Sequence, residues 1–217
     1  MTRAGAAPAD VERGAQPLRS DAARNRKRLL EAAAEVFAER GLEAGVEEVA
    51  RVAGVGMGTL YRRFPTKEAL IDELVGELLI DVLSRARIAR GAPGGEGLER
   101  FLHDVGELQS ARLGCLPRLW NTAQHADLQA EIRAATTALL NDAQRHGRVR
   151  PDLAPADVYA VMWSLRGVIE MTKGTAPDAW ERHLEIILLG MRPSPAALER
   201  APMSRAAMKR LVERLPV

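Results

Sequence analysis

Apolar side chains recur every three or four residues along most of the chain, and no segment alternates with period two for long enough to form a strand. The pattern predicts an all-α fold. Residues 1–19 show no periodicity and are rich in Ala, Pro, Gly and charge, so we expect them to form a disordered arm. A first helix then begins with Ser20 or Asp21 as its cap and ends at Gly41.

Two short helices are predicted after Gly41. The first has apolar positions at helical spacing: Val46, Val49, Ala50 and Ala53. Gly54 permits a tight turn, the second helix carries Leu60, Tyr61 and Phe64 on one side, and Pro65 ends the unit. Together with the first helix, this predicts a three-helix helix-turn-helix domain at residues 20–65.

A long helix follows, with Thr66 as its cap, and runs to a Gly-rich loop at residues 90–97. Its wide apolar stripe has eight members: Leu70, Ile71, Leu74, Val75, Leu78, Leu79, Val82 and Leu83. Further helices are predicted from Leu98 and from Pro117, from Leu128 to Gly147, from Pro155, and from about Trp180 to Pro193. Residues 66–193 are therefore expected to form a helical bundle that the long helix joins to the N-terminal domain.

The last two long helices are apolar on nearly all sides, so each needs a second apolar neighbour. We expect that neighbour to be the same helix pair from another copy, giving a homodimer with a four-helix interface. The alternative is that both are central core helices of the monomer. A tail at residues 194–217 carries a short amphipathic helix capped by Ser204, whose role the sequence does not assign. Its apolar positions are Ala207, Met208, Leu211 and Leu215.

Composition narrows the class of protein. No apolar run in the 217 residues approaches the ~20 that a membrane helix needs, and the N-terminus lacks the apolar core of a signal peptide, so a cytoplasmic location and no membrane partner are expected. Cys115 is the only cysteine, which excludes an intrachain disulfide and a cysteine-rich zinc site. We expect no cofactor and no metal.

The formal charge is only +2, but five basic residues cluster between residues 19 and 28. Arg24 and Arg28 are candidates for contacts with DNA phosphates, the alternative being a solvated charged face. In the second short helix, Leu60 and Phe64 face the core. The candidates for contact with base edges or phosphates are the remaining positions: Met57, Gly58, Thr59, Tyr61, Arg62 and Arg63. The spacing leaves Met57 undecided between core and groove.

Lys67 lies in the first turn of the long helix, where a positive charge opposes the helix dipole. The unfavourable interaction is worth about 0.3 to 1 kcal/mol. A bound phosphate would turn this local misfit into an attraction. The alternative is an incidental surface lysine beside Glu68.

The stretch "LLEAAAEVFAERGLEAGVEEVARVAGVGMGTLYRRFPTKEALIDEL" resembles the N-terminal domain of TetR-family transcriptional regulators. The resemblance implies a helix-turn-helix from Gly45 to Phe64, phosphate contacts by Tyr61 and Lys67, and binding of a palindromic operator in double-stranded DNA by a homodimer. It also implies a variable helical C-terminal domain that holds a small-molecule effector pocket and the dimer interface.

Two departures from the family pattern affect DNA recognition. Gly56 stands where the family often has a serine before the recognition helix, so a phosphate-binding hydroxyl is missing, although glycine costs only a few tenths of a kcal/mol as a cap. Glu47 occupies a position that can approach bases in the family. It is either an acid favoured by the start of its helix or an acceptor for cytosine N4, and we favour the first interpretation.

Six residues of the C-terminal domain could line an effector pocket, although each could equally be core or interface: His103, Leu116, Trp120, Met162, Trp163 and Arg166. Arg166 lies in an apolar helix, where a guanidinium needs a partner such as Glu170 or an anionic ligand.

The sequence therefore predicts a homodimeric DNA-binding regulator, most often a repressor, that an unknown effector releases from its operator. An effector-independent regulator or activator of the same fold is the alternative. An enzyme is not expected, because the four histidines are scattered at positions 103, 125, 146 and 183 and no HExxH motif, Gly-rich phosphate loop or nucleophile elbow is present.

Overall fold

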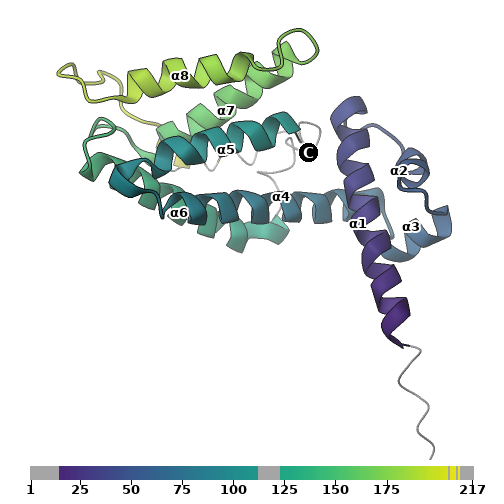
Figure 1. Ribbon diagram of the computed structural model, residues 1–217. Coiled ribbons are helices and arrows are strands. Elements are labelled where there is room, and N and C mark those ends of the chain that lie inside the picture. The colour runs from purple at the N-terminus through teal and green to yellow at the C-terminus, as the bar shows by residue number, and fades with distance from the viewer. Residues whose placement is uncertain (1–14, 112–122, 205, 209, 211–217) are drawn as a thin grey trace, which may run out of the picture.

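The computed structural model describes residues 15–111, 123–204, 206–208 and 210. These residues form helices and connecting loops, with no β-strand among them, which confirms the predicted all-α class. Figure 1 shows a small N-terminal unit joined by a long helix to a larger bundle. The helices are α1 (Ala15–Arg40), α2 (Val46–Ala53), α3 (Met57–Arg63), α4 (Lys67–Ala89), α5 (Gly97–Ala111), α6 (Ala126–Arg145), α7 (Pro155–Thr172) and α8 (Ala179–Met191), with single 3-10 turns η1 (Pro93–Gly95) and η3 (Ala123–His125). None of these described helices has the length and apolar character needed to cross a membrane.

Helices α1, α2 and α3 form the N-terminal unit around a shared apolar core. Leu29, Phe37, Val49 and Leu60 are completely buried. Gly54 follows α2 with φ of 62°, a left-handed conformation that favours glycine, and this lets the chain turn directly into α3. Two short helices joined by this turn and backed by α1 form the predicted helix-turn-helix.

The start of α1 differs from the prediction. The helix is described from Ala15 onward, so Ser20 and Asp21, the expected caps, both lie inside it. Pro17 is the third residue of the helix and is compatible with this position, because the first-turn N–H groups have no partner within the helix. The end agrees with the prediction, since α1 stops at Arg40 and Gly41 has φ of 74°.

Helix α4 connects the two units, as the sequence predicted. Thr66 caps it by accepting a hydrogen bond from the backbone N of Ala69 at 3.1 Å. All eight members of the predicted stripe are buried. The helix packs against α1 as well as against α5 and α6, so it contacts both the N-terminal unit and the bundle.

Helices α5 to α8 complete the bundle, with α7 and α8 packed against each other in one outer layer (Figure 1). Gly106 of α5 allows the ring of Trp180 in α8 to lie directly on the helix backbone, where a Cβ would collide with it. Helix α8 buries Trp180 and Leu184 but exposes Ile186 and Leu189. It is therefore not a central core helix of the protomer.

The remaining boundaries follow the sequence where they are described. Helix α7 begins at Pro155, and Gly147, with φ of 65°, follows the end of α6. The helix predicted from Pro117 lies mostly outside the described residues. The described chain resumes at residue 123 with the turn η3. In the tail, Ser204 caps a turn by accepting a hydrogen bond from the backbone N of Ala207 at 3.1 Å, whereas positions 211 and 215 lie outside the described residues.

Candidate nucleic-acid interface

Helix α3 has one buried side and one open side. Leu60 is completely buried, and Phe64, directly after the helix, is 1% exposed. Gly58, Tyr61, Arg62 and Arg63 are exposed, while Thr59 is half-buried. Met57, which the sequence left between core and groove, is half-buried with its side chain packed against the core. The seven-residue helix thus presents a polar and basic surface that the fold does not cover.

Glycines begin both α2 and α3. Gly45 and Gly56 are the N-caps, and neither helix has a side-chain cap hydrogen bond. A Cβ added at Gly56 or Gly58 would meet nothing within 4 Å, so the start of α3 is an open backbone surface. At Gly45 a Cβ would lie 2.5 Å from Oε2 of Glu47. This fold-back of the Glu47 carboxylate toward the start of α2 fits its interpretation as an acid favoured by the helix dipole.

The two adjacent arginines of α3 have different surroundings. Arg62 makes no ion pair with any described residue. Nη2 of Arg63 lies 3.5 Å from Oε1 of Glu73 in α4, and the Arg63 guanidinium is 5.7 Å from the centre of the Phe64 ring. The sequence placed both arginines in one basic surface, whereas among the described residues Arg63 has an ion-pair and a ring partner and Arg62 has neither.

Three further predicted cations lie on α1 and α4. Arg28 extends across the turn of the helix-turn-helix, because its Nη2 is 2.8 Å from the place where a Cβ of Gly54 would be. Arg24 is exposed one turn earlier on α1. Lys67 is the first residue of α4, half-buried, and makes no ion pair within the described part of the chain. Its ammonium therefore has the unfavourable dipole position that the sequence indicated.

Four of the six predicted effector residues lie within the described part of the chain, on α5 and α7. His103 is exposed on α5, where its ring meets the edge of Trp180 with centroids 6.5 Å apart. Met162 is buried in α7, and Trp163 is half-buried beside Tyr159. Leu116 and Trp120 lie outside the described residues.

Arg166 has a protein partner. Its Nε donates to Oε1 of Glu170 at 2.8 Å, one helical turn away, and its side chain is 20% exposed. The structure thus provides the protein acid among the two partners that the sequence considered.

The buried polar groups between α5, α6 and α7 were not predicted from the sequence. Nε2 of Gln109 donates to the carbonyl of Met162 at 3.3 Å, and its buried Oε1 has no hydrogen-bond partner among the described residues. Burial raises the pKa of Tyr159 to about 12, although the neighbouring hydroxyl of Thr136 acts in the opposite direction. Gln109 could have been found from the sequence, because it continues the register of Leu102 and Val105 into the core.

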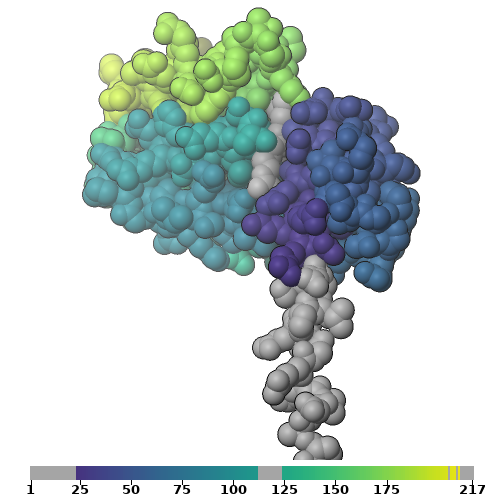
Figure 2. Space-filling view, turned by 45° about the vertical axis from the view of Figure 1, so that its right-hand side comes forward, coloured from purple at the N-terminus to yellow at the C-terminus, as the bar shows by residue number. Residues whose placement is uncertain are grey.

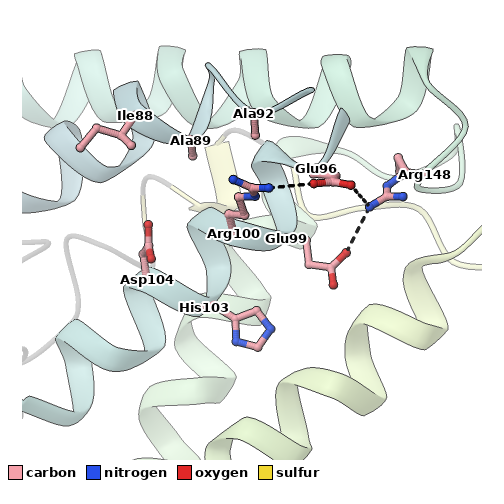
Figure 3. A pocket seen from close by; sticks show the side chains of 9 residues that line it. All are labelled: Ile88, Ala89, Ala92, Glu96, Glu99, Arg100, His103, Asp104 and Arg148. Carbon is pink, nitrogen blue, oxygen red and sulfur yellow. Dashed lines mark hydrogen bonds and ion pairs between the residues drawn. The ribbon is translucent and has the colours of Figure 1, made fainter. Parts of the chain in front are cut away.

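His103 instead lines a surface pocket of about 580 Å³ at the far end of α4 and the start of α5 (Figure 3). Its charged side chains bind one another: Nη2 of Arg100 lies 2.9 Å from Glu96, and Nη2 of Arg148 lies 3.4 Å from Glu96 and 3.9 Å from Glu99. Both arginines that line the pocket are therefore already paired with acids of its own lining.

Two family models match separate parts of the chain. Residues 29–74 match the model of bacterial regulatory proteins of the tetR family, and residues 94–193 match the C-terminal domain of SbtR-like transcriptional regulators. The HTH-type transcriptional repressor KstR2 of Mycobacterium tuberculosis is 31% identical over 187 residues, which cover 76% of this chain and 92% of KstR2.

Two solved structures show the same architecture. A TetR transcription regulatory protein from Mycobacterium vanbaalenii is 35% identical with a TM-score of 0.60, and the match covers 81% of this chain and 99% of that one. A γ-butyrolactone receptor described as ArpA-like is 26% identical with a TM-score of 0.61, covering 79% of this chain and 90% of the receptor. With a helix-turn-helix open on one side and a helical bundle behind it, this chain belongs to the TetR family of DNA-binding transcriptional regulators.

Proposed function

We propose that this regulator is a homodimeric repressor that binds a palindromic operator and is released from it by a small molecule. KstR2 is named a transcriptional repressor, and the ArpA-like structure is that of a γ-butyrolactone receptor, so relatives of this fold include both a repressor and a receptor. Because it reads chromosomal DNA, we place it in the cytoplasm. The observation that carries the proposal is the uncovered polar side of α3.

The DNA contacts follow from the geometry of that side. Gly58 and Thr59 at the start of α3 face the major groove, where the open backbone of Gly58 allows close approach to base edges. Arg62 and Tyr61 bind phosphates on one flank, and Lys67 binds one at the start of α4. Arg28 and Arg24 add contacts from α1.

The dimer interface is the outer face of α7 and α8. Met171, Ile186 and Leu189 are 86%, 58% and 57% exposed, and Figure 2 shows this layer, in green, at the surface of the molecule. Gly167 and Gly190 on the same helices would accept a Cβ without meeting any atom within 4 Å, so their backbones are open to close approach by a partner helix. A two-fold axis here would place two α3 helices on half-sites one or more helical turns apart, each turn being about 34 to 36 Å.

The effector site lies in the bundle formed by residues 66–193. Gln109, Thr136 and Tyr159 supply buried polar groups to a mainly apolar interior, a combination typical of small-molecule sites. Met162, Trp163 and Arg166 lie on the same helix as Tyr159. An effector that binds the operator-incompetent conformation more tightly shifts the population toward it, and α4 carries the change to the DNA-binding unit.

The DNA contacts are tested on fragments selected from genomic DNA by the full-length protein. With a recovered duplex of about 30 base pairs, Lys67→Gln is expected to reduce the slope of log K against log salt concentration by about 0.9, one phosphate contact. Arg90→Gln is the matched control, because Arg90 lies at the other end of α4, is exposed and makes no ion pair with a described residue. Equal slopes for both variants, or recovery of no palindromic fragment, would contradict the proposal.

A further inference from the structure

Glu73 of α4 holds positive charges from both α1 and α3. Its Oε1 atom accepts a hydrogen bond from Nε of Arg26 and lies 3.5 Å from Nη2 of Arg63. The side chains of Glu73 and Arg26 are 30% and 33% exposed, whereas that of Arg63 is 48% exposed. One carboxylate oxygen therefore links the DNA-facing helix α3 to the helix that joins the two domains.

A second carboxylate lies one turn further along α4. Oε1 of Glu77 is 3.1 Å from Nη1 of Arg26, and Glu77 makes no ion pair with Arg63. Arg26 is thus held by two acids, and the Arg63 guanidinium pairs with one acid and lies over the Phe64 ring. Loss of Glu73 would leave Arg26 paired with Glu77 but would remove the acid that holds Arg63.

We propose that Glu73 is a positioning residue for DNA recognition that withholds Arg63 from the phosphate backbone, so that Arg62, and not Arg63, supplies the phosphate contact at the end of α3. This inference rests on the DNA-contacting surface proposed above. Arg62 and Arg63 are adjacent and of the same type, but only Arg63 contacts Glu73 and the Phe64 ring.

Three physical effects keep Arg63 from binding a phosphate. To bind a phosphate, the Arg63 guanidinium would have to leave both the carboxylate and the Phe64 ring, whereas Arg62 has no ion pair with a described residue to break. A phosphate placed on Arg63 in its present position would also lie near the Glu73 charge, which repels it. Arg26 fixes that carboxylate in advance, so little side-chain freedom remains to be lost when Arg63 pairs with it. Since the pair is partly exposed, we expect an effect of only about two- to fivefold in affinity.

The test compares Glu73→Gln with Glu77→Gln. Both variants remove one negative charge from the same helix, one turn apart, but only the first releases Arg63. Affinity for a fluorescein-labelled duplex containing the recovered fragment is measured by anisotropy between 50 and 200 mM KCl. Glu73→Gln is expected to bind more tightly than Glu77→Gln and to have a slope steeper by about 0.9, because Arg63 gains one phosphate contact.

Combination with Arg63→Gln identifies the residue responsible. In the Glu73→Gln background, Arg63→Gln should remove the extra slope, whereas in the wild type it should reduce the slope by less than Arg62→Gln does. Equal slopes for Glu73→Gln and Glu77→Gln, or equal losses for the two arginines in the wild type, would overturn the proposal. Thermal unfolding followed by circular dichroism establishes that each variant is folded, and if Glu73→Gln is not, the comparison of the two arginines in the wild type still decides. A wild type that binds no duplex would refute the proposed DNA surface itself, an outcome distinct from failure of the Glu73 inference.

Discussion

Replacement of Ile186 by glutamate should weaken the dimer. Ile186 is 58% exposed in the protomer, so an interface that covers it buries more than half of an isoleucine side chain. Complete burial of such a side chain is worth roughly 1.5–3 kcal/mol, which gives about 1–2 kcal/mol for this position. A two-fold interface uses the position twice, so the loss is about 2–4 kcal/mol per dimer, or roughly 30- to 700-fold in the dissociation constant.

Sedimentation velocity over a range of protein concentrations measures this constant. Ile80→Glu is the matched control, because Ile80 is 55% exposed on α4, outside the proposed interface. Both isoleucines are exposed in the protomer, so both variants should fold, with circular dichroism as the check. If Ile186→Glu and Ile80→Glu dimerise equally well, the assignment of the α7–α8 face is refuted.

Three other changes probe the bundle and its link to the DNA-binding unit. Gly106→Ala should lower the free energy of unfolding by about 1–3 kcal/mol in chemical denaturation, because the added Cβ meets the ring of Trp180. Alkaline difference spectroscopy should show Tyr159 ionising near pH 12, and unfolding should become easier between about pH 10 and pH 12, since only the unfolded state readily loses this proton. Lys173→Met should speed hydrogen exchange of the backbone amides at residues 39–44. The Lys173 ammonium donates to the carbonyl of Ala38, which is one of the last four carbonyls of α1, so its loss should loosen the end of that helix.

Each of these three predictions has a contradicting result. Unchanged stability of Gly106→Ala would mean that the α5–α8 contact adapts without cost. If the loss of stability between about pH 10 and pH 12 persists in Tyr159→Phe, a group other than Tyr159 causes it. Unchanged exchange at residues 39–44 in Lys173→Met would show that α7 does not restrain the end of α1.

Periodicity and glycine positions were sufficient to predict most of the fold. The buried stripe of α4, the left-handed Gly41 and Gly54, and the start of α7 at Pro155 are all local features, set by residues within one or two turns. The predicted start of α1 was wrong. A proline in an Ala-rich segment suggests irregular structure, although the first turn of a helix tolerates a proline.

The chemistry of the site could be predicted only by residue type. Arg62 and Arg63 have the same character in the sequence, and their difference depends on Glu73, which contacts Arg63 from another helix. The exposed position of His103 could have been foreseen, because the stripe containing Leu102 and Val105 places it on the outer side of α5. Which side chains meet across helices depends on the packing angles, and these are not encoded in the spacing of any one helix.

Hydroxyl-radical footprinting of the wild-type protein on a recovered genomic fragment tests most directly whether two copies of α3 read the DNA. Two protected patches, separated by one helical turn of DNA or a multiple of it, are expected. Both should weaken together in Arg62→Gln, while Arg90→Gln should leave them in place. A single protected patch, or two patches that Arg62→Gln leaves unchanged, would contradict the account.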